Sequence, residues 1–174
     1  EFKASTNYST KFLGLFHEQY KNLDCDNYVY SEVGSFQMEF LALTEITGDK
    51  KYANLALNVY RELWNNQKLD GLISNPIGGG YDSYYEYIIK TYLQTRGSSP
   101  ALLSHYTTFT SDLQKKLVIQ FKKFTFIGVK TRYFLRPSIE YFTTFAAGML
   151  AIGSVKENKN AKKDFELAAD LSQT

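Results

Sequence analysis

The sequence contains few of the residues on which disulfide-stapled folds and zinc sites depend. Cys25 is the only cysteine among 174 residues, so it is either an idle thiol or bonded to a segment or partner outside this sequence. The two histidines, His17 and His105, are far apart in the chain and do not show the spacing of metal ligands. No phosphate-binding loop or Ser-His-Asp arrangement is present. These absences exclude an internal disulfide and disfavour zinc, nucleotide and serine-hydrolase chemistry.

Neither charge nor hydrophobicity is concentrated along the chain. Its 20 basic and 18 acidic residues give a net charge of +2, too little to attract nucleic acid or an anionic membrane. The most apolar run, 146–155, is far shorter than the roughly 20 residues of a spanning helix. Residues 1–3 lack the pattern of a signal peptide, so we expect any targeting segment to have been removed or to lie outside this sequence. The triplet Asn7-Tyr8-Ser9 is an N-glycosylation acceptor, which weakly supports a secretory location.

Aromatic residues and helical periodicity are abundant instead. The chain has 14 Tyr and 13 Phe, and a tyrosine offers an apolar face and a hydroxyl that suit a sugar as well as the edge of a core. Apolar residues recur at helical spacing in three pairs of segments, each typical of a helical hairpin. These pairs are 35–46 with 51–64, 82–95 with a helix through 111–114 to about 124, and 140–152 with 160–171.

The three hairpins share one design. Their first helices begin near Gly34, Asp82 and Glu140, and each is expected to end at a glycine, respectively Gly48, Gly97 and Gly153. The run "FTFIGVKTRYFL", 125–136, alternates and is rich in β-branched and aromatic residues, which predicts a short strand pair or an extended connection. The predicted fold class is therefore all-α, a single domain over 1–174 built from helical hairpins with a short β insertion.

The start of the second hairpin, "GGGYDSYYEY", has two interpretations. Ser83 and Glu86 have the spacing of a capping box, and Asp82 would complement the helix dipole. Alternatively, Asp82 and Glu86 are four residues apart and face one side of the helix, where they could act on a ligand.

The functional interpretation extends to the other hairpins. If their first helices form the inner wall of a ring, Glu32, Asp82 and Glu140 gather at one mouth, and Glu39 lies one turn further in. Several carboxylates around one cavity are what glycoside hydrolysis needs. Around them, Tyr84, Tyr85 and Tyr87 would be either core residues or stacking faces for a sugar, and the three glycines would let backbone approach a ligand closely.

Several segments carry a resemblance to a known family. They are "SEVGSFQMEFLALTEITGDKKYANLA" (31–56), "QKLDGLI" (67–73), "GGGYDSYYEYIIKTYLQT" (78–95), "SIEYFTTFAAGMLAIGS" (138–154) and "FELAADLSQT" (165–174). The chain from Tyr30 onward resembles glycoside hydrolase family 47, the class I α-1,2-mannosidases of the secretory pathway.

The resemblance implies an (α/α)7 barrel that trims α-1,2-linked mannose from high-mannose N-glycans by an inverting mechanism in the endoplasmic reticulum or Golgi lumen. It implies a Ca²⁺ that binds the sugar, with its protein ligand outside this sequence. By position, Asp82 matches the catalytic carboxylate of the family's DSYYEY motif, whereas Glu39, Glu86 and Glu140 match acidic residues of the sugar site.

The chain also departs from the family. Seven hairpins of about 50 residues need roughly 350 residues, so about three to four of the seven are expected here, and the family's other catalytic carboxylates are not in this sequence. Tyr141 stands where many members have histidine. Gly80 stands where the endoplasmic-reticulum processing type has arginine. A glycine at this position resembles the ER-degradation-enhancing mannosidase-like subgroup.

Three functions stay open at this point. The first is an active mannosidase, and the second is a glycan-binding module, catalytically weak or inactive, that acts on misfolded glycoproteins in quality control. The third is a helical scaffold whose carboxylates are only caps.

Overall fold

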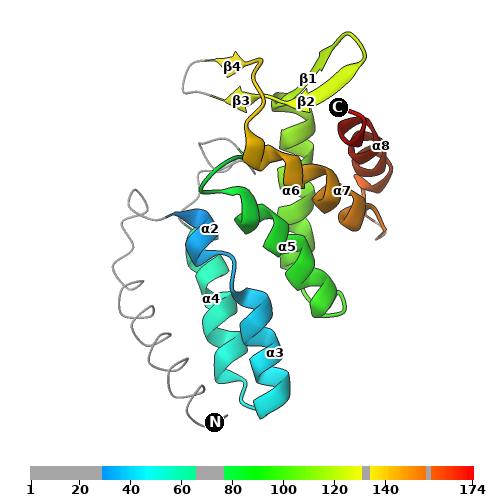
Figure 1. Ribbon diagram of the computed structural model, residues 1–174. Coiled ribbons are helices and arrows are strands. Elements are labelled where there is room, and N and C mark those ends of the chain that lie inside the picture. Colours follow the sequence, from blue (N-terminus) through cyan, green and yellow to red (C-terminus); the bar gives the residue numbers. More distant parts are fainter. Residues whose placement is uncertain (1–28, 66–76, 131–133, 156–157) are drawn as a thin grey trace.

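A computed structural model describes residues 29–65, 77–130, 134–155 and 158–174 (Figure 1). In chain order its helices are α2 (Tyr30–Val33), α3 (Gln37–Thr47), α4 (Lys51–Asn65), α5 (Asp82–Gln94), α6 (Pro100–Lys116), the 3-10 turn η2 (Tyr141–Thr144), α7 (Phe145–Ser154) and α8 (Ala161–Ser172). Its strands are β1 (Val118–Phe121), β2 (Phe124–Ile127), β3 (Val129–Lys130) and β4 (Leu135–Arg136). The strands form two antiparallel pairs, β1 with β2 and β3 with β4.

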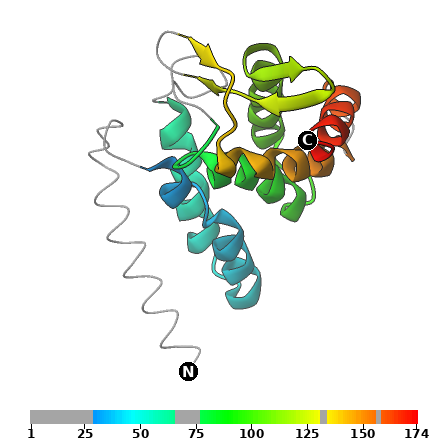
Figure 2. The same cartoon turned by 45° about the horizontal axis from the view of Figure 1, so that its top comes forward.

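The helices pack as three hairpins, α3 with α4, α5 with α6 and α7 with α8. Helix α5 is central, because it also contacts α2, α3 and α7. Both views show the hairpins following one another across the molecule, with α3 and α4 at one end and the strands near the other (Figures 1 and 2). The predicted helical architecture with a small β insertion is confirmed.

The first two hairpins turn at the predicted glycines. Gly48 adopts the left-handed conformation with φ of 73°, and its amide donates to the Thr44 carbonyl at 2.8 Å. The next helix is capped as expected, because the Asp49 carboxylate accepts the Lys51 amide at 3.0 Å. The C-cap of α5 is Thr95, and the left-handed turn follows it at Arg96 and Gly97, with φ of 54° and 77°; the Gly97 amide donates to the Tyr92 carbonyl at 2.9 Å.

The third glycine has a different role, and the prediction that Gly153 ends its helix is wrong. Gly153 lies inside α7, where a Cβ would collide with the phenol ring of Tyr106 from α6. Tyr106 is fully buried and donates to Asp164 of α8 at 3.0 Å, so its ring has no room to move. Gly153 is therefore required for packing rather than for termination.

This packing predicts opposite effects for two glycine substitutions in α7. Gly153→Ala should lower the free energy of unfolding by about 1–3 kcal/mol, because the added methyl overpacks the contact with Tyr106. Gly148→Ala is the matched control: a Cβ there meets nothing within 4 Å. It should raise that free energy by about 0.5–1 kcal/mol, since alanine is the better helix former. Chemical denaturation of both variants tests this, and equal effects of the two substitutions would contradict the packing role.

Helix α6 ends earlier than the sequence predicts. It stops at Lys116 rather than near residue 124, and β1 follows at once. Val118 and Ile119 pair with Ile127 and Phe126 of β2, and Lys122 makes the turn with a positive φ of 55°. These apolar residues satisfy a helical pattern and a strand pattern equally well, and cross-strand pairing decides between them. The strands predicted within 125–136 are confirmed, with β1 added before them.

The start of the third hairpin also differs from the prediction. Glu140 is extended, with φ of −97° and ψ of 134°, and residues 141–144 form a 3-10 turn before α7 begins. The chain therefore enters this helix through one tighter turn, which leaves Tyr141 and Phe142 exposed.

The core is built largely from aromatic rings. Tyr84 and Tyr85 are each 1% exposed, so the core interpretation of these two residues is confirmed. Tyr85 stacks on Phe109 with ring centroids 3.9 Å apart, and Tyr84 accepts a hydrogen bond from the Trp64 indole at 3.0 Å. The buried Tyr84 hydroxyl is thus paired, as burial of a polar group requires.

His105, in α6, is the histidine that the described residues include. His105 stacks on Trp64 at 3.6 Å between ring centroids, and burial lowers its pKa, which suits a packed neutral ring. Cys25, His17 and the triplet at Asn7 lie outside the described residues. Among the helices of the described ranges, none is long and apolar enough to cross a membrane.

Candidate functional site

The candidate site begins at the glycine turn before α5. The amides of Tyr81 and Asp82 both donate to the Gly78 carbonyl at 2.9 Å, and Gly80 makes the turn with φ of 88°. The Gly80 carbonyl in turn accepts the Ser31 amide of α2 at 2.9 Å. Backbone hydrogen bonds thus set the position of Asp82 as the first residue of α5.

The predicted capping box is wrong. Tyr81 is the N-cap of α5 and makes no side-chain cap. The Ser83 hydroxyl is hydrogen-bonded to that of Ser35 at 2.7 Å, and Glu86 pairs with Lys90 at 2.7 Å. Ser83 therefore joins the first hairpin to the second, and Glu86 is available on the helix surface rather than folded back on the backbone.

Glu140 reaches the same turn from the third hairpin. Its Oε1 accepts the Gly79 amide at 2.7 Å, and a Cβ at Gly78 would collide with its carboxylate. The close approach that the glycines permit is therefore made by a carboxylate of this chain. The turn holds Glu140 beside the start of α5, at Gly79, which precedes Asp82 by three residues.

A cleft opens between α5 and the start of the third hairpin. It has a volume of about 450 Å³ and is lined by Asp82, Ser83 and Glu86 of α5, and by Tyr141, Phe142, Thr144 and Phe145. Two carboxylates on one wall and exposed aromatic rings on the other are suited to a sugar, whose hydroxyls donate to carboxylates and whose apolar face packs on rings.

Glu39 lies outside the lining of this cleft. On α3, it is exposed, and its Oε1 accepts the hydroxyl of Tyr87 on α5 at 2.9 Å. Burial raises the pKa of Tyr87 to about 12, with help from the negative charges of Glu39 and Glu86. Tyr87 is therefore neither a core residue nor a free stacking face; it holds Glu39 in place.

The Tyr87 hydrogen bond predicts a pH-dependent effect on stability. Tyr87→Phe should cost about 0.5–1.5 kcal/mol at pH 8, where the phenol is protonated in both folded and unfolded chains. Because the folded pKa is raised above the ordinary value of 10, this stabilisation should decline between pH 10 and pH 12.

Denaturation of the wild type and the variant at pH 8 and pH 11 checks this. Tyr92→Phe on the same helix is the control, because within the described residues its hydroxyl makes no hydrogen bond. A Tyr87→Phe cost that is equal at both pH values would contradict the assignment.

The predicted site residues are thus brought together in part. Asp82 and Glu86 line one cleft, Glu140 lies against the turn that precedes them, and Glu39 is linked to the same helix through Tyr87. Glu32 of α2 is exposed and makes no ion pair with another described residue.

Sequence reasoning missed two parts of the site. It did not find Phe142 and Phe145 as lining residues, because the 3-10 turn exposes Phe142 and leaves Phe145 half-buried at the cleft. It also missed the Glu86–Lys90 pair, although the spacing of four residues was a usable signal.

No group of three or more His, Cys, Asp or Glu side chains that could hold a metal ion occurs in the described parts of the chain. The Ca²⁺ implied by the resemblance stays a prediction, with its protein ligand expected outside this sequence.

Comparisons with known proteins point in one direction. The sequence profile of glycosyl hydrolase family 47 matches residues 2–174. The mannosyl-oligosaccharide 1,2-alpha-mannosidase MNS1 of Arabidopsis thaliana is 31% identical over 166 residues, which cover 84% of this chain and 29% of that protein. The mannosyl-oligosaccharide 1,2-alpha-mannosidase of Candida albicans is 30% identical over 175 residues, which cover 83% of this chain and 31% of that protein.

A solved structure supports the fold. The alpha-1,2-mannosidase from Trichoderma reesei matches with a TM-score of 0.73 at 23% identity, covering 83% of this chain and 34% of that one. This likeness confirms that the three hairpins have the α/α-barrel fold. The chain spans about a third or less of each protein it matches here.

Proposed function

The chain belongs to glycosyl hydrolase family 47, and from this premise we propose that the intact protein removes α-1,2-linked mannose from high-mannose N-glycans. The observation that carries the proposal is the cleft in which Asp82 and Glu86 face exposed aromatic rings. The named activity of the relatives supports the same substrate class.

Asp82 is proposed as one catalytic carboxyl of an inverting mechanism. In that reaction one carboxylic acid protonates the leaving oxygen while a second carboxylate activates the water that attacks the anomeric carbon. The second catalytic group is assigned to the part of the barrel outside this sequence. Asp82 is suited to its role because its Oδ1 accepts the Ser83 amide at 2.7 Å, which fixes the carboxyl at the cleft wall.

The other three acidic residues are proposed to bind the sugar. Glu86 projects into the cleft one turn below Asp82. Glu140 is held at the glycine turn by the Gly79 amide, and Glu39 by the Tyr87 hydroxyl. Each of these carboxylates is positioned by a partner, which favours binding because little side-chain entropy is then lost.

Residues 1–174 are proposed to be about three to four of the seven hairpins of the barrel. Two exposed apolar side chains support this proposal, Ile46 at the end of α3 and Phe165 on α8, which are 66% and 62% exposed. Hairpins outside this sequence would cover such faces. Activity is accordingly expected of the intact protein rather than of this segment alone.

The proposed setting is the lumen of the endoplasmic reticulum or Golgi, where high-mannose N-glycans or misfolded glycoproteins are the partners. A calcium ion held by residues outside this sequence would supply contacts to the sugar there. A mixed disulfide through Cys25 stays a prediction that no described residue tests.

A second candidate function is a glycan-binding module of quality control that has weak or no catalysis. Tyr141 favours it, because this side chain is 81% exposed on the cleft at a position where many members have histidine. Gly80 also favours it, because a glycine at this position resembles the ER-degradation-enhancing mannosidase-like subgroup.

One experiment separates the two functions. The intact protein is incubated with a defined high-mannose N-glycan in the presence of Ca²⁺, and both released mannose and bound glycan are measured. Release of mannose supports the mannosidase, and binding without release supports the second function. If the protein neither released mannose nor bound the glycan, both functions would be refuted.

A further inference from the structure

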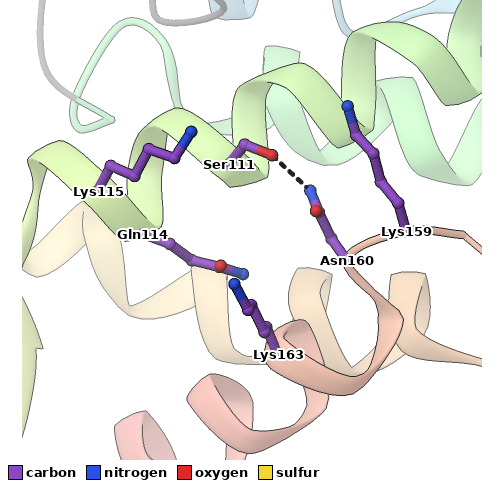
Figure 3. Close-up of a pocket in the computed structure, with 6 residues that line it drawn as sticks. All are labelled: Ser111, Gln114, Lys115, Lys159, Asn160 and Lys163. Atoms are coloured by element: carbon purple, nitrogen blue, oxygen red, sulfur yellow. Dashed lines mark hydrogen bonds between the residues drawn. The ribbon is translucent and has the colours of Figure 1, made fainter.

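A second cleft lies between α6 and the start of α8 and shares no lining residue with the candidate sugar cleft. Its volume is about 420 Å³. Two walls face each other across it, one from α6 and one from the segment that begins α8 (Figure 3). The lining residues are Ser111, Gln114, Lys115, Lys159, Asn160 and Lys163.

The three lysines of this cleft have no acidic partner in the part of the chain that the structure describes. Among the residues that the structure describes, neither Lys115, Lys159 nor Lys163 takes part in an ion pair. Four other lysines do pair with carboxylates: Lys51 with Asp49, Lys90 with Glu86, Lys116 with Asp112 and Lys162 with Glu166. Three like charges around one hollow repel one another, and a concave surface of one sign concentrates counter-ions.

The opposite wall is fixed by a buried side chain. The Asn160 amide nitrogen donates to the Thr107 carbonyl at 2.7 Å, to the Thr110 hydroxyl at 2.8 Å and to the Ser111 hydroxyl at 2.9 Å. These bonds anchor the start of α8 on α6, so that the segment that carries Lys159 and Lys163 lies opposite the part of α6 that carries Ser111 and Lys115. Because the Ser111 oxygen accepts from Asn160, its own proton is free to donate into the cleft (Figure 3).

The carboxylate of Asp164 lies near this cleft and contributes to its charge. Asp164 is buried; its Oδ1 accepts from Gln114 at 2.6 Å, and its Oδ2 accepts from Tyr106 at 3.0 Å. Burial raises the pKa of Asp164 to about 6. Even when ionised, its single charge is met by these neutral donors and leaves the cleft net positive.

We propose that this lysine-lined cleft between α6 and α8 binds an oxyanion of the phosphate or sulfate type. Three ammonium groups and one hydroxyl donor supply the charge-assisted hydrogen bonds that such a group accepts. Lysine binds phosphate as a compact point charge and so needs no bidentate geometry. The positive end of α8 adds a smaller contribution of the same sign.

Isothermal titration of the full chain with inorganic phosphate, at an ionic strength matched with chloride, tests the proposal. We expect saturable binding that is about tenfold weaker in each of Lys159→Ala and Lys163→Ala, since each removes a charge-assisted hydrogen bond. Lys162→Ala is the matched control, because Lys162 lies beside Lys163 on α8 but does not line the cleft. The Lys162→Ala variant should bind phosphate as tightly as the wild type.

Glucose 6-phosphate distinguishes the source of the anion. Tighter binding of this ester than of inorganic phosphate indicates a ligand that carries its phosphate on a larger group, and equal binding indicates a free ion. Phosphate heats no larger than those of chloride, or equal losses in Lys162→Ala and Lys163→Ala, would overturn the proposal. The mannosidase assay uses the other cleft, so its failure leaves this test unaffected.

Discussion

Asp82→Asn should reduce mannose release by the intact protein about 10²- to 10⁴-fold in kcat/KM, the range expected when a group that transfers a proton is removed. The substitution keeps the local structure, because an asparagine oxygen can still accept the Ser83 amide that Asp82 accepts at 2.7 Å. Thermal stability should therefore change little while activity is lost.

A matched substitution controls for charge alone. Asp170→Asn removes an exposed carboxylate of α8 that lines neither described cleft. Its kcat/KM should stay within about twofold of the wild type, as surface substitutions rarely act at a distance. If Asp82→Asn also retained nearly full activity, Asp82 would have no catalytic role.

Gly78→Ala should reduce kcat/KM about 10- to 100-fold while leaving the protein folded. The added Cβ would collide with the carboxylate of Glu140, which is the mobile end of a side chain and can swing away. Glu140 then loses its bond to the Gly79 amide and its place beside the start of α5. The loss corresponds to one charged hydrogen bond to the sugar, about 1.5–3 kcal/mol.

Gly79→Ala provides a graded control. Its Cβ would lie 3.2 Å from the Glu140 carboxylate and 3.4 Å from the Phe142 ring, contacts that small shifts relieve. We expect a loss of only a few-fold in the same assay, and Glu140→Gln should reproduce most of the Gly78→Ala effect. Equal activity of Gly78→Ala and the wild type would remove Glu140 from the sugar site.

Local patterns were enough to predict much of the fold. Helical spacing of apolar residues identified the hairpins, and the Gly48 and Gly97 turns followed from the need for a residue that tolerates positive φ. The shared face of Asp82 and Glu86 also followed from spacing alone, because residues four apart lie on one side of a helix.

The remaining features depend on contacts between segments that are distant in sequence. Ser83 bonds to Ser35, 48 residues away, rather than to its own helix, and Glu140 bonds to Gly79 across 61 residues. Gly153 similarly faces Tyr106 of another helix. A local rule such as the capping box cannot anticipate a partner supplied by tertiary structure, and such a partner overrides it.

The central claim is that carboxylates from separate hairpins surround one sugar at the start of α5. The most direct measurement is a crystal structure of the intact Asp82→Asn variant with α-1,2-linked mannobiose. We expect a mannose ring between α5 and residues 141–145, within hydrogen-bond distance of the side chains at positions 82, 86 and 140. A sugar bound elsewhere, or carboxylates 86 and 140 that point into separate regions of solvent, would contradict the claim.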